Sequence, residues 1–90
     1  MTKEECKVKL EEIAKFQENN PTLHSVVIFW KSPLTSDVEC RTAYFEEYMD
    51  ADNYCTEQSN FYEENDIPYA SYLNTRIYRT KEELFWINIE

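Results

Sequence analysis

Carboxylates crowded into one stretch are the side chains of this sequence with the most obvious capacity for chemistry. The stretch is FEEYMDADNYCTEQSNFYEEND, residues 45–66, which contains eight acidic residues and no lysine or arginine. Grouped carboxylates can transfer protons as general acids and bases, coordinate a divalent cation, or present negative charge to a basic partner. The eight acids are Glu46, Glu47, Asp50, Asp52, Glu57, Glu63, Glu64 and Asp66.

Enzymatic catalysis is the first of these chemistries that the sequence disfavours. General acid–base work needs two acids held in different environments within a cleft, and a chain of 90 residues has little room for one. His24 is the only histidine, so no obvious base is present to activate a serine or cysteine nucleophile. Glycine is absent, and phosphate-binding loops and dinucleotide-binding turns require it. We therefore expect a protein that is not an enzyme and has no catalytic residues.

A specific metal centre is the second chemistry that the sequence disfavours. Asp50 and Asp52 match the first and third positions of an EF-hand loop. However, Cys55 stands at the position that requires glycine, and Phe61 stands where a bidentate glutamate is needed. The three cysteines and the single histidine also lack the short paired spacings of a zinc site. We therefore expect no metal ion and no cofactor.

Negative charge is unevenly distributed along the chain. The formal net charge is −9, and residues 37–66 contain ten acids against the single base Arg41, which leaves −9 in that segment alone. The other sixty residues contain eight acids and eight bases and sum to zero. Direct binding to nucleic acid is disfavoured, because phosphate contacts require a basic patch.

Two interpretations of residues 37–66 follow: a solvated acidic face kept for solubility, or an anionic surface that docks onto a basic protein. Docking is favoured because compensating bases are missing and because aromatic residues, which are enriched in binding hot spots, are interleaved with the acids. The residues that we expect to contact a partner are Glu39, Glu46, Glu47, Asp50, Asp52, Glu57, Glu63, Glu64 and Asp66 as charges, with Tyr54 and Tyr62 as anchors.

The density of these charges suggests the kind of partner. One strand of duplex DNA carries a charge every ~3.4 Å along the axis. If residues 45–66 formed one helix they would span roughly 33 Å, which is one carboxylate per ~4 Å. Such a surface could imitate a phosphate backbone to a DNA-binding protein. The alternative is a general acidic interaction module that neutralises a basic partner unrelated to DNA.

A small, acidic chain with this carboxylate-rich run resembles the phage-encoded DNA-mimic inhibitors, and among them the anti-restriction nuclease type (Arn). The resemblance covers size, charge and residues 45–66. It implies a non-enzymatic inhibitor that works in the host cytoplasm and occupies the DNA-binding site of a restriction endonuclease. It also implies a homodimer, because DNA mimics often act as dimers. The chain departs from this family by concentrating its acids in one third of its length instead of spreading them over several elements.

The elements before this segment have clear local signals. Thr2 followed by Glu5 is a capping box, and the apolar periodicity after it predicts a helix over residues 3–18. LHSVVIFWK, residues 23–31, has a continuous apolar centre and predicts a buried strand. The alternating residues 38–45 predict a second strand, paired antiparallel with the first.

The elements in and after the acidic segment are less marked. Residues 50–64 predict a helix capped by Asp50 or Asp52, with one face lined by Tyr54, Gln58, Phe61 and Tyr62. Residues 69–80 and 83–90 predict two strands, with a turn at 81–83 between them. We therefore expect residues 1–90 to form a single α+β domain, in which an antiparallel sheet of about four strands carries two helices on one face.

No apolar run approaches the ~18 residues that a membrane-spanning helix needs. The charged N-terminal segment lacks the hydrophobic core of a signal peptide. The three cysteines are an odd number and widely spaced, which is typical of reduced thiols. We therefore expect a cytoplasmic protein that does not bind membranes.

Overall fold

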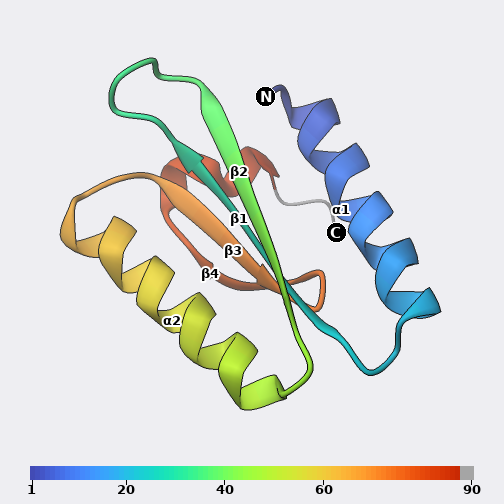
Figure 1. Ribbon diagram of the computed structural model, residues 1–90. Coiled ribbons are helices and arrows are strands. Elements are labelled where there is room, and N and C mark those ends of the chain that lie inside the picture. Colours follow the sequence, from blue (N-terminus) through green and yellow to red (C-terminus); the bar gives the residue numbers. More distant parts are fainter. Residues whose placement is uncertain (88–90) are drawn as a thin grey trace.

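Two long helices and a four-stranded antiparallel sheet make up the protein (Figure 1). The structure is a computed structural model, and it describes residues 1–87. Its elements are α1 (Lys3–Asn19), β1 (His24–Lys31), β2 (Val38–Phe45), α2 (Tyr48–Glu64), β3 (Tyr69–Leu73), β4 (Arg76–Thr80) and the short 3₁₀ helix η1 (Glu82–Ile87). The strand order is β2-β1-β3-β4. The α+β class, the antiparallel sheet and the two helices predicted from the sequence are confirmed.

The two helices cover opposite faces of the sheet, so the prediction of helices on one face was wrong. On α1, Gln17 accepts a hydrogen bond from Ser25 of β1, at 2.8 Å. On α2, Ser59 hydrogen-bonds to Ser71 of β3, at 2.8 Å, and Ser71 lies beside Ile28 in the sheet. Because neighbouring residues of a strand point to opposite faces, Ser25 and Ile28 lie on different sides. Figure 1 shows the sheet between α1 and α2.

The residues of β1 explain why both faces need a cover. Its centre, from Val26 to Phe29, is fully buried, so apolar side chains leave the strand in both directions. A strand of this kind is stable only where helices or other elements exclude water from both sides. α1 supplies Cys6, Leu10 and Ile13 to the core on one side, and α2 covers the other.

The first half of the chain follows its local signals closely. Helix α1 begins at Lys3, and both hydrogen bonds of the capping box between Thr2 and Glu5 are present. Strands β1 and β2 pair antiparallel along all eight residues of each, from His24 with Phe45 to Lys31 with Val38. These predictions depend on residues close together in sequence, which is why they are confirmed.

The segment 69–80 is a β-hairpin, not one strand. Asn74 and Thr75 form a two-residue turn between β3 and β4, with φ angles of 54° and 65°. Two successive left-handed residues are typical of the type I′ turn that best matches the twist of paired strands. Asparagine followed by glycine is the usual signal for this turn, and the sequence, which has no glycine, uses threonine in the second position.

The C-terminal prediction was also wrong as far as the structure describes it. Residues 82–87 form the 3₁₀ helix η1 instead of a strand, and the fourth strand is supplied by residues 76–80. The proposed turn at 81–83 is therefore the passage from β4 into η1, and residues 88–90 of the predicted strand lie outside the described residues. Within residues 1–87, neither long helix has an apolar stretch of the length that crossing a bilayer would require.

Candidate acidic interface on helix α2

Helix α2 begins earlier than the sequence predicted and lacks the predicted cap. Its first residue is Tyr48, and Glu47 stands at the N-cap position without a side-chain hydrogen bond to the helix. Asp50 and Asp52 therefore lie inside the helix. Asp50 still contributes favourably from the first turn, because a carboxylate there interacts with the positive end of the helix dipole.

The face of α2 that packs on the sheet consists of four side chains at helical spacing. Ala51, Cys55, Ser59 and Tyr62 are buried, and the hydroxyl of Ser59 also hydrogen-bonds to the carbonyl oxygen of Cys55, at 2.7 Å. Phe61, which was predicted to share this face, is 54% exposed. Small residues at three of the four buried positions let the helix approach the strands closely, and the only large buried side chain is Tyr62.

The opposite face of α2 presents a straight polar line to solvent. Its members alternate between carboxylate and carboxamide at steps of three and four residues, and every one is exposed. We call this line the α2 seam, and it consists of Asp50, Asn53, Glu57, Asn60 and Glu64. The carboxylates recur every seventh residue, which separates them by about 10.5 Å along the axis and by about 21 Å from first to last.

Two arginines of the sheet reach α2 without pairing with the seam carboxylates. Arg41 of β2 lies over the ring of Trp30, at 5.5 Å, and donates a hydrogen bond to Gln58 Oε1, at 3.0 Å. Arg79 of β4 lies over the ring of Tyr78 and donates to the carbonyl oxygen of Thr56, at 3.4 Å. Both guanidinium groups are held by aromatic rings and neutral acceptors, and Arg79 also reaches the side-chain oxygen of Asn60 in the seam, at 3.5 Å.

The remaining predicted acids are distributed around the seam. Glu63 and Asp66 share the ammonium group of Lys81, at 3.4 and 3.2 Å, and Asp52 accepts a hydrogen bond from the hydroxyl of Tyr78. Three further acids lie on the strand β2 and in the turn that leads to α2: Glu39, Glu46 and Glu47, all of them exposed. The structure therefore brings Asp50, Glu57 and Glu64 into one line, and it neutralises part of the rest.

The two predicted anchors face inward. Tyr62 is 4% exposed and stacks on Trp30, with ring centroids 5.4 Å apart. Tyr54 is half-buried against Phe45, at 5.3 Å. The exposed apolar side chains beside the seam are instead Phe61 and Met49, and their outward position could have been inferred only from the rotation of the helix on the sheet.

The spacing of charge also differs from the value expected for a single helix over residues 45–66. Helix α2 contains 17 residues, which corresponds to about 25 Å, because residues 45–47 belong to β2 and the turn after it. The fully solvent-facing carboxylates are about 10.5 Å apart, not ~4 Å. Residues on the flanks and in the turn raise the charge of this face, but they do not extend the line.

Helix α1 provides an internal comparison. It carries Glu4, Glu11 and Glu18 at the same seven-residue spacing, all exposed. Between them stand Lys7 and Lys15, and the ammonium group of Lys7 lies 3.9 Å from the carboxylate of Glu4. The outer face of α1 is therefore a mixed-charge surface, whereas the α2 seam has neutral asparagines between its carboxylates.

The described part of the chain offers little other chemistry. Among residues 1–87, no three His, Cys, Asp or Glu side chains lie close enough together to hold a metal ion. His24 contacts the side-chain amide of Asn74, at 3.4 Å, and packs edge-on against Tyr48. The side chain of Asn74 also accepts a hydrogen bond from Gln17, at 2.6 Å, so this cluster fixes the β3–β4 turn to the end of α1.

The three thiols are held in their protonated form. Burial raises the pKa of Cys6 to about 11, and burial also raises the pKa of Cys40 and of Cys55. Burial raises the pKa of Tyr72, on β3, to about 12. Because the thiolate is the reactive form of cysteine, these groups are poor nucleophiles at neutral pH.

We expect the free energy of unfolding to fall as the pH rises above about 9. The folded protein keeps protons on these groups that the unfolded chain releases near the ordinary thiol pKa of about 8.5. Their contribution to stability is therefore complete below that pH and is lost as the pH approaches the raised values. Urea unfolding at several pH values measures this, and Cys6→Ala should flatten the decline. A stability that stays constant up to pH 11 would contradict the assignment.

Comparison of the chain with protein-family models, with curated protein sequences and with solved structures found no match in any of the three.

Proposed function

We propose that this protein is a non-enzymatic inhibitor that presents the outer face of α2 to a nucleic-acid-binding protein in place of DNA. The observation that carries the proposal is the α2 seam: three exposed carboxylates aligned over about 21 Å, with no lysine or arginine between them. Self-repulsion among these charges costs stability, and a face kept only for solubility would normally mix the two signs, as α1 does.

The arrangement of the neighbouring groups supports this function. Arg41 and Arg79 would be the natural ion-pair partners of the seam carboxylates, yet they bind neutral oxygens: those of Gln58 and Thr56 on the flanks, and that of Asn60 within the seam. The seam carboxylates are thus free to meet the lysines and arginines of a DNA-binding surface. Phe61 beside the seam adds an exposed aromatic contact, and it takes the anchoring role that the buried Tyr62 cannot supply.

The resemblance to phage anti-restriction proteins narrows the proposed partner to a restriction endonuclease or another host defence nuclease. A general acidic module, which neutralises a basic protein unrelated to DNA, would use the same seam. The two functions differ in one respect. Duplex DNA competes for the partner of a DNA mimic, but it does not compete for the partner of a general module.

The test is competitive release by DNA. Immobilised protein is loaded with bacterial lysate at low salt, and a 20-bp duplex should elute a bound protein that then binds the purified chain in a direct titration. The affinity should fall steeply as salt is raised, because the contacts are between charges. A bound protein that duplex DNA does not release would support the general acidic module instead.

We expect the triple variant Asp50→Asn, Glu57→Gln, Glu64→Gln to bind the recovered partner about 30-fold more weakly. An exposed ion pair is worth about 0.2–1 kcal/mol, and three pairs at about 0.7 kcal/mol each give about 2 kcal/mol, which is that factor. Removing the repulsion within the seam should leave the fold intact, which circular dichroism would verify.

The matched control is Glu4→Gln, Glu11→Gln, Glu18→Gln on α1, which removes the same charge at the same spacing. This variant should bind nearly as well as the unaltered protein. Equal losses in the two triple variants would show that only the total charge matters, and would reject the seam as the binding site.

A further inference from the structure

One edge of the sheet, strand β2, is open. In an antiparallel ladder, successive residues point their N–H and C=O groups alternately to the partner strand and away from it. The N–H of Ser32 donates to the carbonyl oxygen of Asp37, whereas the carbonyl oxygen of Val38 accepts from the ammonium group of Met1. The even-numbered residues of β2 therefore point outward, and those beyond Val38 are Cys40, Thr42 and Tyr44.

The other edge of the sheet is protected, which makes the contrast informative. Strand β4 has only five residues, and the register shifts between Ser71 and Tyr72, where a β-bulge interrupts its pairing with β3. Short strands, bulges and positively charged side chains are the usual devices that prevent edge-to-edge pairing. Strand β2 has eight residues in unbroken register and no proline, and its one positively charged side chain, Arg41, lies over Trp30 and bonds to Gln58 of α2.

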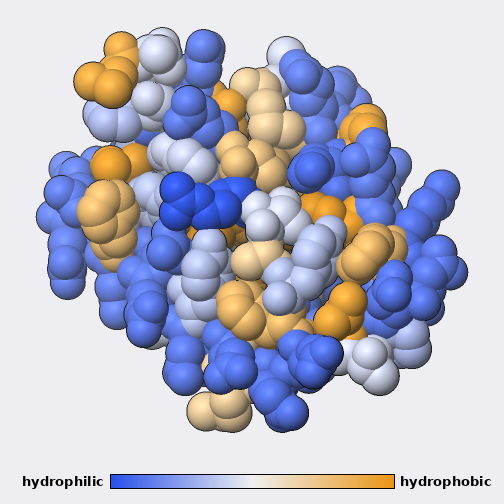
Figure 2. Space-filling view, in the orientation of Figure 1, coloured by the Kyte–Doolittle hydropathy of each residue, from blue (hydrophilic) through white to orange (hydrophobic). Residues whose placement is uncertain are grey.

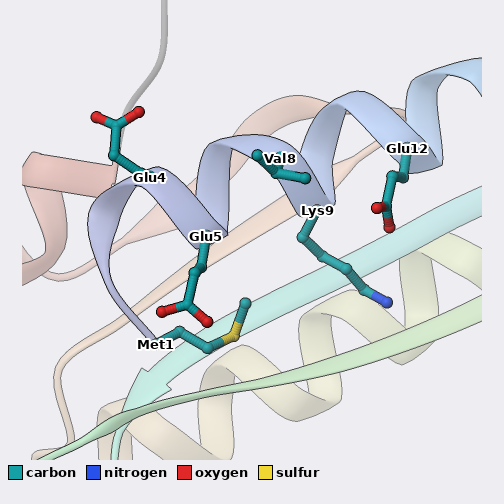
Figure 3. A pocket seen from close by; sticks show the side chains of 6 residues that line it. All are labelled: Met1, Glu4, Glu5, Val8, Lys9 and Glu12. Atoms are coloured by element: carbon teal, nitrogen blue, oxygen red, sulfur yellow. The ribbon is translucent and has the colours of Figure 1, made fainter.

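A groove runs beside this open edge on the α1 side. It has a volume of about 340 Å³ and is lined by Met1, Val8 and Lys9 together with acidic residues of α1. In Figure 3 the side chains of Met1 and Lys9 point from α1 toward the strands. Figure 2 shows weakly polar and apolar surface in the middle of the face that carries β2, interrupted by one strongly hydrophilic side chain, between flanks that are mostly hydrophilic.

We propose that β2 pairs antiparallel with β2 of a second copy of this chain, with Thr42 on the twofold axis. This register leaves the contact between Met1 and Val38 undisturbed. It places Cys40 opposite Tyr44 of the second copy, and Tyr44 opposite Cys40. Three outward-pointing residues on each strand then form about six backbone hydrogen bonds, two for each pair.

Side chains on the α1 side fit a second copy in this register. Tyr44, which is 40% exposed, would enter the groove of the other copy next to Lys9. Lys9 lines that groove, and its charge partly lowers the pKa of Cys40, which burial raises. One residue beyond the strand, Glu46 would come opposite Val38, whose carbonyl oxygen already holds the ammonium group of Met1. Ring and carboxylate thus meet a groove in which Met1 and Val8 give apolar surface. The ammonium groups of Lys9 and Met1 supply two positive charges there, and Glu4, Glu5 and Glu12 supply three negative ones.

The pairing would join the two sheets into one and place both α2 helices on the same face. The two α2 seams would then form one longer acidic surface, and the use of that surface for binding rests on the proposed function. The pairing of the strands does not rest on it. The two proposals can therefore fail separately. The elution experiment with duplex DNA tests the function, and the association of the purified chain with itself tests the pairing.

The decisive experiment is site-specific cross-linking. Across a hydrogen-bonded pair the Cα atoms are about 5.5 Å apart, which lies within the range of a disulfide. The variant Cys40→Ser, Thr42→Cys should therefore form a covalent dimer under mild oxidation. The unaltered protein should not, because its two Cys40 residues would be separated by four positions, about 13 Å. The matched control Cys40→Ser, Ile77→Cys, on the protected edge, should stay monomeric.

Sedimentation equilibrium provides a second test that needs no new cysteine. The unaltered protein should be a dimer at about 0.5 mM, and both Thr42→Pro and Tyr44→Asp should be monomeric with unchanged circular dichroism. The N–H that the proline removes points outward, so the fold does not depend on it. A monomeric unaltered protein at that concentration, or a disulfide between two Cys40 residues, would overturn the proposed pairing.

Discussion

Replacing Phe29 with alanine is expected to lower the free energy of unfolding by about 3–5 kcal/mol. Phe29 lies in the central strand β1, has no exposed surface, and packs edge-to-face against Tyr72, with ring centroids 5.9 Å apart. Truncating a buried phenylalanine costs about 3–5 kcal/mol, through lost burial and the cavity that remains. A domain of this size has a total stability of about 5–10 kcal/mol, so the loss consumes much or all of it. Urea unfolding monitored by circular dichroism measures the change.

Phe61→Ala is the matched control for this prediction. It removes the same side chain from α2, where it is 54% exposed, and should lower the free energy of unfolding by less than about 1 kcal/mol. The same variant should weaken partner binding if Phe61 contacts the partner. Similar destabilisation by the two substitutions would mean that α2 is rotated differently on the sheet, and the α2 seam would then not face solvent.

The variant Asn74→Ala should lower the free energy of unfolding by about 3 kcal/mol. Its side-chain oxygen accepts hydrogen bonds from Gln17 and from the backbone of Ser25, at 2.6 and 3.2 Å. Alanine would leave these donors without that acceptor, at a cost of about 1–3 kcal/mol for each one that stays buried. Asn74 also has a φ of 54°, a conformation that asparagine adopts more easily than alanine. Thermal and urea unfolding would measure the loss.

The neighbouring substitution Thr75→Gly distinguishes the contribution of the backbone conformation of this turn from that of its side-chain hydrogen bonds. Thr75 has a φ of 65°, which is unfavourable for a β-branched residue and costs glycine nothing. We expect this variant to be more stable than the unaltered protein, by about 0.5–1 kcal/mol. If Asn74→Ala proved neutral while Thr75→Gly stabilised, the turn would depend on backbone conformation alone, and the hydrogen-bonded cluster would contribute little.

Both stability predictions concern the frame that holds the α2 seam in place. The seam faces solvent because Ala51, Cys55, Ser59 and Tyr62 fix the rotation of α2 on the sheet. The sheet in turn is held by the buried centre of β1 and by the turn at Asn74. Variants that damage this frame would reduce binding indirectly, and for that reason the seam is tested with substitutions of exposed carboxylates that conserve size.

The sequence by itself determined the features that depend on neighbouring residues. The capping box at Thr2, the apolar run of β1 and the alternation of β2 each specify an element from within a few residues, and the structure has all three. The segregation of charge into residues 37–66 is likewise a property of the sequence. Even the need for a cover on both faces of β1 could have been inferred from its uninterrupted apolar centre.

Only the tertiary structure decided which side chains share a surface. Lys81 pairs with Asp66 across fifteen positions, and Tyr78 bonds Asp52 across twenty-six, because the β3–β4 hairpin returns the chain alongside α2. These contacts give partners within the protein to two carboxylates, Asp66 and Asp52, of the acidic run that the sequence shows over residues 45–66. The rotation of α2 buried Tyr62 and exposed Phe61, although the two are adjacent in sequence. Periodicity defines the faces of a helix, but packing against the sheet selects the one that water contacts.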